Sequence, residues 1–395
     1  MRAPTTLTTA AQSNNTFVAQ LLDANLPSFQ QRLYTLFSNY GNYSTFSNEA
    51  WIPDGHENEY DSLESLHDTI HNILGGGVGH MAYIPFSSFD PIFFLQHAMV
   101  DRIFAMWQAL YPTAWITPEP AKMNSYTTSL GQIQDSGSPL TPFFLDSNRN
   151  FWTSDMVRDP EALGYTYAEI AGISLSNPII NETARAQVIA AINQLYGGSS
   201  PGSLAVARRS RSLQDASILG RRTVDHLSHS VGKPASRDVI VNDEYREWTA
   251  NIRAQKQALD GPFSVTLFLG EVPTDPRSWR SDPGAIGTMS IFAAPAMHAR
   301  KMLPSGMHTT GTIPMTSTLA TMVAEGILPS LEVGDIEPYL RAWLEVRVLR
   351  ADGTPVNPSE VEDLSIRIVS SRVRAASSEE ELPQWGNVDF SFDLV

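Results

Sequence analysis

The chain has 395 residues, enough for two or three domains, and its 42% hydrophobic and 17% charged residues are typical of a packed globular protein. Acidic residues outnumber basic ones by 42 to 27, and the formal charge of −15 argues against nucleic acid or an anionic membrane as a partner and favours a small molecule. Cysteine is absent, which excludes disulfides, cysteine nucleophiles and thiolate ligands. Any metal ion would therefore be bound through nitrogen and oxygen.

Residues 1–15 contain no continuous apolar core of the kind that a secretory signal needs. No stretch of the chain approaches the roughly 20 apolar residues of a membrane span. We therefore predict a soluble, intracellular protein of the cytoplasm.

The first half of the chain carries helical patterns. After a polar N-terminal arm, Phe29, Leu33 and Phe37 recur at helical spacing, which predicts an amphipathic helix within residues 27–40. Residues 46–61 are rich in Pro, Gly and Asn and predict a loop. Asp61 or Ser62 then caps a helix that should end before the glycines that begin at residue 75.

A second capping pattern, an aspartate followed by proline, opens the next helix at Asp90 and Pro91, and this helix should continue to about Leu110. Residues 118–145 read as an irregular connection. The segments 158–170 and 181–197 predict two further helices that close a mainly helical domain near Tyr196.

The character of the chain changes after residue 196. Residues 197–238 are rich in Ser, Gly and Arg with weak periodicity, which predicts a mobile linker. Runs with period-two alternation follow at 261–270, 286–294, 339–356, 364–373 and 388–395 and indicate an antiparallel β-sandwich. The predicted fold is α + β, with a helical domain at 1–196, the linker at 197–238 and the sandwich at 239–395.

Three histidines and one glutamate form the candidate site. Glu64, His67 and His71 lie three and four residues apart, so on a helix they share one face, and His97 follows on the next helix. We predict that the three histidines bind one metal ion. Glu64 could be a general base, a metal ligand, a residue that orients a ligand or a solvated helix residue, and we favour the base.

The surroundings of these histidines resemble the second copper-binding half of the tyrosinase, catechol oxidase and hemocyanin family. The resemblance covers the HDTIH pair at 67–71, the glycine-rich 75–81 and the segment 90–104, and it extends through 151–159, 163–170 and 245–270 to match fungal tyrosinases. It implies that His67, His71 and His97 are the three metal ligands and that Glu64 is the acidic residue beside them. It also implies a C-terminal domain that packs over the active site.

The sequence departs from the family in ways that change the implied chemistry. A two-copper site needs three more histidines from earlier helices, and the only histidine before Glu64 is His56. Gln96 stands where the family usually has a histidine, and Asp68 where many tyrosinases have asparagine. Three neutral imidazoles with an open fourth position suit a zinc ion acting as Lewis acid, with copper as the alternative.

As a whole the arrangement resembles the fungal cyclopenases of quinolone alkaloid biosynthesis. That resemblance implies a non-oxidative lyase that converts cyclopenin or cyclopenol, both heteroaromatic, to viridicatin or viridicatol with loss of methyl isocyanate. In this hypothesis the metal polarises a carbonyl or epoxide oxygen and Glu64 moves a proton.

Two other hypotheses stay open. The chain could be half of a split or truncated tyrosinase-type copper phenol oxidase, or a non-catalytic binding module that a metal stabilises. A homodimer is also possible. Elsewhere, we predict that His80 is structural and bonds to backbone, and that Asp101 pairs with Arg102 or orients an imidazole. Phe93 and Phe94 are expected in the core, with the alternative that one of the two faces a bound aromatic substrate.

Overall fold

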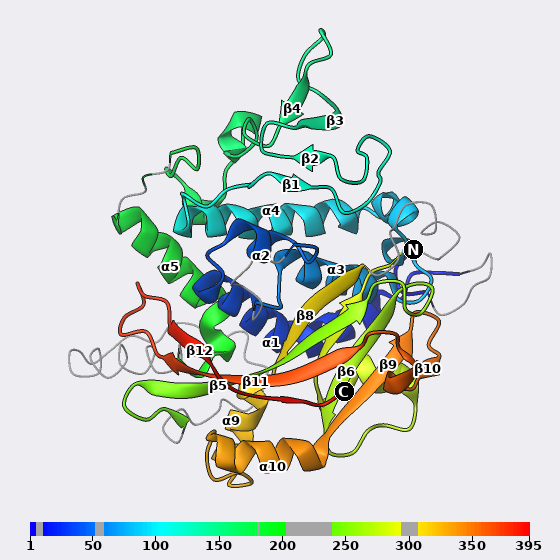
Figure 1. Ribbon diagram of the computed structural model, residues 1–395, viewed down its shortest axis with the longest axis vertical. Helices are drawn as coiled ribbons and strands as arrows, with labels where there is room; N and C mark the ends of the chain where they lie inside the picture. Colours follow the sequence, from blue (N-terminus) through cyan, green and yellow to red (C-terminus); the bar gives the residue numbers. More distant parts are fainter. Residues whose placement is uncertain (5–10, 52–58, 178, 180–181, 203–238, 294–306) are drawn as a thin grey trace.

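The computed structural model describes residues 1–4, 11–51, 59–177, 179, 182–202, 239–293 and 307–395. Figure 1 shows a group of helices in the middle of the molecule, a β-structure below them and a small strand-rich extension above. This is the predicted α + β class. Residues 203–238 of the predicted linker lie outside the described part of the chain, as do His56 and residue 298.

Among the described residues, two helices precede the helix that carries His67 and His71. Helix α1 (Asn15–Asn39) is longer than the pattern predicted, because Val18 and Leu21 are buried together with Phe37. The predicted polar arm is therefore wrong from residue 15 onward. Helix α2 (Tyr43–Ser47) overlaps the first two residues of the predicted loop.

Helix α3 (Leu63–Gly75) carries His67 and His71 and begins as predicted, because the Ser62 side chain accepts a hydrogen bond from the backbone nitrogen of Ser65. The helix includes one glycine more than expected, Gly75, and its C-cap is Gly76, whose φ of 58° lies in the left-handed region that glycine tolerates.

The second site helix also follows the sequence. Helix α4 (Ile92–Leu110) starts after Asp90 and Pro91, and Asp90 Oδ1 accepts a hydrogen bond from the backbone nitrogen of Ile92 at 3.1 Å. Two short 3-10 turns, η1 (His80–Ala82) and η2 (Ile84–Phe89), connect it to α3.

The segments after α4 were predicted only in part. Residues 118–145 contain short strands rather than purely irregular chain: β1 (Glu119–Pro120), β2 (Ile133–Gln134) and β3 (Pro139–Phe144), which pairs with β4 (Phe151–Thr153). The helix expected at 158–170 is wrong, since the segment forms two 3-10 turns, η3 (Pro160–Leu163) and η4 (Ala168–Ile170). Helix α5 (Glu182–Tyr196) is confirmed, and the turn η5 (Gly197–Ser199) follows it.

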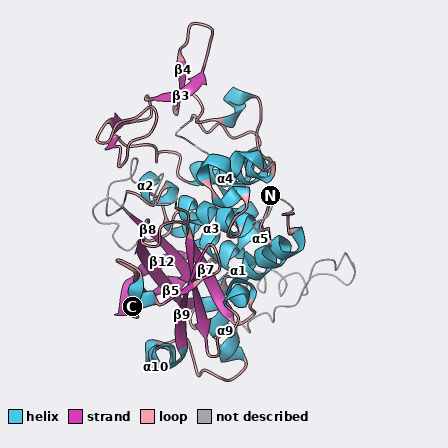
Figure 2. Cartoon of the chain, turned by 90° about the vertical axis from the view of Figure 1, so that its right-hand side faces the viewer, coloured by secondary structure: helices cyan, strands magenta, loops and turns pink. Residues whose placement is uncertain are grey.

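The second half forms the predicted antiparallel sandwich of two four-stranded sheets (Figure 2). One sheet has the order β10-β9-β6-β7 and the other β12-β11-β5-β8. Their strands are β5 (Glu244–Gln255), β6 (Phe263–Leu269), β7 (Ala285–Ile291), β8 (His308–Pro314), β9 (Leu344–Arg350), β10 (Pro355–Val356), β11 (Ser365–Arg374) and β12 (Gln384–Asp393).

Buried side chains of both sheets, such as Trp248, Val265, Ile313 and Ile366, form one core between them. The short turns η6 (Pro276–Ser281) and η7 (Pro358–Glu360) lie in connections of this domain. Helices α9 (Thr316–Ala324) and α10 (Val333–Trp343) also belong to this half, so the alternation expected from residue 339 begins only at Leu344. Residues 339–343 belong to helix α10 instead, whose buried residues Ile336 and Leu340 lie four apart, the spacing of one helix face.

A buried polar interface joins the helices to the sandwich. Arg32 on α1 forms an ion pair with Asp61 at 2.6 Å, and both side chains are almost fully buried. Thr312 on β8 donates a hydrogen bond to the same carboxylate at 2.6 Å. Helix α3 also contacts β7, where the backbone nitrogen of Ser290 donates to Thr69 Oγ1 at 3.3 Å. The site helix α3 is thereby held against the C-terminal domain.

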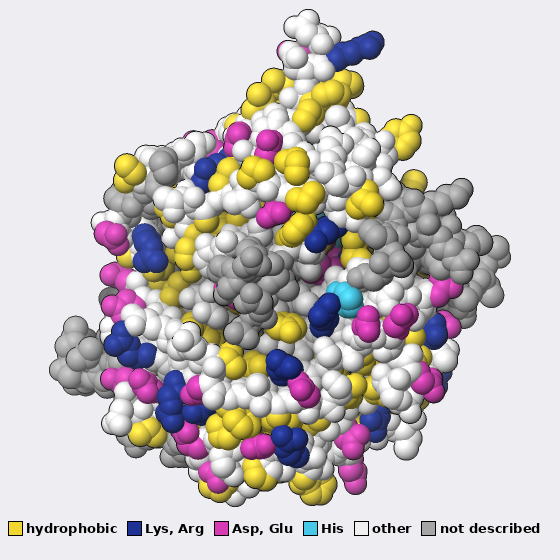
Figure 3. Space-filling model, in the orientation of Figure 1, with side chains coloured by type: hydrophobic (Ala, Val, Ile, Leu, Met, Phe, Trp, Pro, Cys, Tyr) yellow, Lys and Arg dark blue, Asp and Glu magenta, His cyan; other side chains and the backbone are white. Residues whose placement is uncertain are grey.

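In the part of the chain that the structure describes, no helix combines the length and apolar character needed to cross a membrane. Large exposed hydrophobic side chains gather instead at the upper end of the molecule, where Figure 3 shows them over the extension. Phe143 and Phe144 on β3 belong to this group.

Candidate metal centre

The three predicted ligands meet in space. Their ligand atoms, from His67 and His71 on α3 and His97 on α4, all lie within 4.8 Å of one another. The closest pair is His67 Nε2 and His97 Nε2, at 3.0 Å. Among the described residues, no other group of histidine and acidic side chains has this arrangement.

The second nitrogen of each ring has a partner of its own. Nδ1 of His67 lies 3.0 Å from Asp68 Oδ1, Nδ1 of His71 lies 2.8 Å from the carbonyl oxygen of Met81, and Nδ1 of His97 lies 2.7 Å from the carbonyl oxygen of Phe93. A carbonyl or carboxylate oxygen accepts a hydrogen bond, so Nδ1 carries the proton in each neutral ring. The Nε2 lone pairs of all three rings are then free for a metal ion.

Burial keeps these rings neutral. It lowers the pKa of His67 and that of His71 to about 4, and it lowers the pKa of His97 as well. A lone pair is available to a metal only on a neutral imidazole, so the three rings are ready to bind at neutral pH without losing a proton. The donor set fits one ion with three nitrogen ligands and an open fourth position.

Two aromatic rings hold the imidazoles in place. Phe93, one turn before His97 on α4, lies with its ring centroid 4.0 Å from that of His97. Phe292, which follows β7 in the C-terminal domain, stacks on His71 at 4.7 Å and 22°. The sandwich therefore supplies one wall of the metal centre, a contribution that the family resemblance implied but that no sequence pattern assigned to Phe292.

A cluster of buried charges adjoins His67. It consists of Glu49, Glu64, Asp68 and Lys256, of which only Glu64 was predicted as a site residue. Lys256 Nζ lies 2.6 Å from Glu49 Oε1 and 3.7 Å from Asp68 Oδ2, and Thr309 donates a hydrogen bond to Glu49 Oε2. Because Asp68 also contacts His67, the cluster connects the C-terminal domain to a metal ligand.

Three carboxyl groups share the one cation in this cluster. Burial, followed by the charges of Glu49 and Asp68, raises the pKa of Glu64 to about 7. Burial and the charge of Glu49 also raise the pKa of Asp68 well above its ordinary value. Burial alone would lower the pKa of Lys256, but the carboxylates outweigh it and raise that pKa. Lys256 therefore stays charged.

Glu64 lies one helical turn before His67 on α3. Its carboxylate accepts a hydrogen bond from the backbone nitrogen of Glu49 at 2.9 Å. The role of general base stays a prediction.

Several neighbours differ from expectation. Gln96 donates to the carbonyl oxygen of His67 at 3.0 Å, so it ties α4 to α3. Asp101 accepts hydrogen bonds from Tyr165 and Tyr167, whereas Arg102 pairs with Glu169, so the predicted Asp101–Arg102 pair is wrong.

His80 bonds to the backbone of the N-terminal residue, as predicted: its Nδ1 lies 2.9 Å from the amino nitrogen of Met1, and its backbone nitrogen donates to the Met1 carbonyl oxygen at 2.8 Å. Phe94 is 63% exposed and is therefore not a core residue.

The chain matches two known domain families. Residues 2–110 match the common central domain of tyrosinase, and residues 247–368 match the tyrosinase C-terminal domain. The Neurospora crassa tyrosinase is 28% identical over 98% of this chain, and the Podospora anserina tyrosinase is 31% identical over 78% of it. Hemocyanin 2 of Megathura crenulata is 31% identical over 44% of the chain. The narrower likeness to cyclopenases, and to a second metal-binding half alone, is not confirmed by these matches.

Solved structures show the same fold. A mushroom tyrosinase, crystallised in latent and active forms, superposes with a TM-score of 0.72 at 23% identity and covers 100% of this chain. The Aspergillus oryzae holo-protyrosinase superposes with a TM-score of 0.52 at 18% identity and covers 92%. This chain spans 65% and 58% of the Neurospora and Podospora relatives and 64% of the mushroom structure.

Proposed function

We propose, since this chain belongs to the tyrosinase and hemocyanin family, that His67, His71 and His97 bind a copper ion and that this centre serves a tyrosinase-type oxidoreductase. The observation that carries the proposal is the convergence of three Nε2 atoms whose rings are each fixed through Nδ1. Imidazole nitrogen suits both copper and zinc, and the tyrosinase relatives favour copper over the zinc expected from the sequence.

The residues of this chain have distinct tasks in that proposal. His67, His71 and His97 offer neutral nitrogen ligands, and Phe93 and Phe292 restrict the rotation of two of the rings. The Asp68 carboxyl group and the two backbone carbonyls hold the protons on Nδ1. A bound copper ion supplies redox chemistry with oxygen and phenolic substrates.

An exposed apolar face on α4 supports the oxidase hypothesis. Phe94 and Leu95, which flank the His97 region, are 63% and 72% exposed, and Met99 one turn beyond Leu95 is 45% exposed. Soluble proteins seldom leave adjacent large apolar side chains uncovered without a binding role. We propose that further polypeptide carrying the ligands of a second copper packs on this face, because the family chemistry uses two coppers.

A second candidate function is a mononuclear, non-oxidative lyase of the cyclopenase type. Its support is that the described residues contain a single three-histidine group, with the carboxyl group of Glu64 one turn away. In this alternative the three histidines would hold one zinc or copper ion, which would supply Lewis acidity toward a carbonyl or epoxide oxygen of a heteroaromatic substrate, and Glu64 would transfer a proton.

One experiment separates the two functions. The purified protein is analysed for copper and zinc by mass spectrometry, and turnover is measured on a catechol with an oxygen electrode and on cyclopenin without oxygen. Copper loading with catechol-dependent oxygen consumption supports the oxidase. Zinc loading with anaerobic conversion of cyclopenin would refute it and establish the lyase, in which Glu64→Gln should keep the metal and slow turnover.

A further inference from the structure

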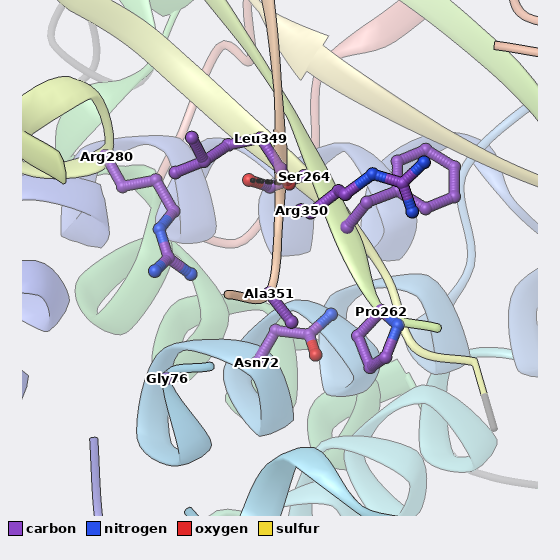
Figure 4. Close-up of a pocket in the computed structure, with 9 residues that line it drawn as sticks. Asn72, Gly76, Pro262, Ser264, Arg280, Leu349, Arg350 and Ala351 are labelled. Atoms are coloured by element: carbon purple, nitrogen blue, oxygen red, sulfur yellow. Dashed lines mark hydrogen bonds between the residues drawn. The ribbon is translucent and has the colours of Figure 1, made fainter. Parts of the chain in front are cut away.

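A small pocket lies between the end of α3 and the C-terminal domain, apart from the metal-binding atoms. It is lined by Asn72 and Gly76 of the helical half and by Pro262, Phe263, Ser264, Arg280, Leu349, Arg350 and Ala351 of the sandwich half. Figure 4 shows the Asn72 side chain pointing from α3 toward the strands, and the Arg280 side chain extending from its turn toward the level of the helix.

Asn72 is the first sign that this pocket takes a ligand. The residue is only 4% exposed, and neither its amide nitrogen nor its amide oxygen has a hydrogen-bond partner among the described residues. A buried polar group without a partner costs about 1–3 kcal/mol, so native proteins seldom leave one unsatisfied. The amide group therefore calls for a polar occupant of the pocket.

Arg280 is the second sign, and it indicates the charge of the occupant. Its Nε atom is buried and has no partner among the described residues, although the side chain as a whole keeps some contact with solvent. Burial lowers the pKa of this guanidinium, and no carboxylate of the described residues acts against that shift. The described residues that line the pocket include no aspartate or glutamate, and a second arginine, Arg350, is among them.

The size of the pocket restricts the occupant. The centre of a water-sized particle can move through only about 10 Å³ of the pocket, so we expect a small occupant rather than a large organic anion. A water molecule could bond to the Asn72 amide but carries no charge, whereas a chloride ion accepts hydrogen bonds and also compensates the guanidinium charge.

We propose that this pocket binds one chloride ion, held by N–H groups of Asn72 and Arg280. The ion connects α3, the helix that carries His67 and His71, to the turn η6 and to the end of β9 in the C-terminal domain. Chloride therefore stabilises the contact between the two halves of the molecule, independently of which reaction the metal centre performs.

The test compares chloride with gluconate, an anion too large for the pocket, at equal ionic strength. Thermal unfolding is followed for the full chain, for Arg280→Met and for the control Arg277→Met. Arg277 lies in the same turn, but its side chain is 82% exposed and pairs with Asp275. We expect chloride to raise the melting temperature of the wild type and of Arg277→Met by ~2 °C at about ten times the Kd, and to leave Arg280→Met unchanged.

An equal effect of chloride on all three proteins, or no effect on the wild type, would overturn the proposal. Chloride that binds at the metal centre would raise the melting temperatures of all three proteins alike, which distinguishes it from chloride bound in the pocket. If Arg280→Met does not fold, crystals of the wild type soaked in bromide give the answer. An anomalous peak between Asn72 and Arg280 is expected, and a pocket without one refutes the site.

Discussion

Replacing Lys256 by methionine removes the only cation from the buried charge cluster beside His67. Lys256 Nζ lies 2.6 Å from Glu49 Oε1, and the Glu49 side chain is 4% exposed. Removing one partner of a buried ion pair typically costs about 3–5 kcal/mol, because the other charge is left unpaired in a medium of low polarity. The Lys256 side chain keeps some exposure and the carboxyl groups can take up protons, so we expect a loss near 3 kcal/mol.

Urea denaturation at pH 7 measures this loss, with Lys122→Met as the control. Lys122 is exposed and lies over the Trp51 ring, so its replacement should cost less than about 1 kcal/mol. The double variant with Glu49→Gln should recover at least about 1.5 kcal/mol relative to the sum of the single changes. A Lys256→Met protein within about 0.5 kcal/mol of the wild type would refute the reasoning.

The same substitution has a consequence for the metal centre. Asp68 contacts both Lys256 and Nδ1 of His67, so loss of the cation changes the group that orients this ring. Substituting a residue that orients a metal ligand typically lowers metal affinity by about 10–100-fold. We expect metal affinity to fall by about tenfold in Lys256→Met and to stay unchanged in Lys122→Met, as measured by competition with a chelator.

Three further predictions concern the metal, the fold and pH. His71→Ala should abolish metal loading, measured by mass spectrometry, whereas the surface variant His308→Ala should load normally. Gly75→Ala should lower the free energy of unfolding by about 1–3 kcal/mol in urea, because the new Cβ would lie 2.1 Å from the backbone nitrogen of Ala82. Burial raises the pKa of Glu247 from 4.5 to about 7, so the unfolded state releases this proton first and stability is lost as pH rises from 4.5 through 7. The free energy of unfolding of Glu247→Gln, taken relative to that of the wild type, should therefore rise by about 3 kcal/mol between pH 4 and pH 8. A difference that does not change with pH would contradict this.

Local patterns were sufficient to identify the metal ligands. His67 and His71 lie four residues apart on a helix whose cap, Ser62, is itself a local signal. His97 could be placed because an aspartate and a proline announce the start of its helix. The alternating runs of the second half likewise predicted strands such as β6 and β11, since period-two patterns record which face of a strand is buried.

Local patterns were less informative where contacts with distant residues stabilise a segment. Helix α1 extends twelve residues before Pro27 because its early turns are buried against the rest of the molecule. The segment 158–170 shows helical composition but forms only short turns. Glu169 in the second of these turns pairs with Arg102 of α4, a contact with a distant part of the chain. Tertiary packing outweighs intrinsic propensity in both places.

The sequence by itself determined the donor set, three histidines without any cysteine, and the order of a helical half followed by a β-sandwich. Only the tertiary structure decided how those histidines are held. Phe292, Lys256 and Arg280 come from strands and turns some 200 residues after His67, and their spacing along the chain carries no periodic signal. Their roles arise because folding buries them beside polar groups that need a ring, a charge or a hydrogen bond as a partner.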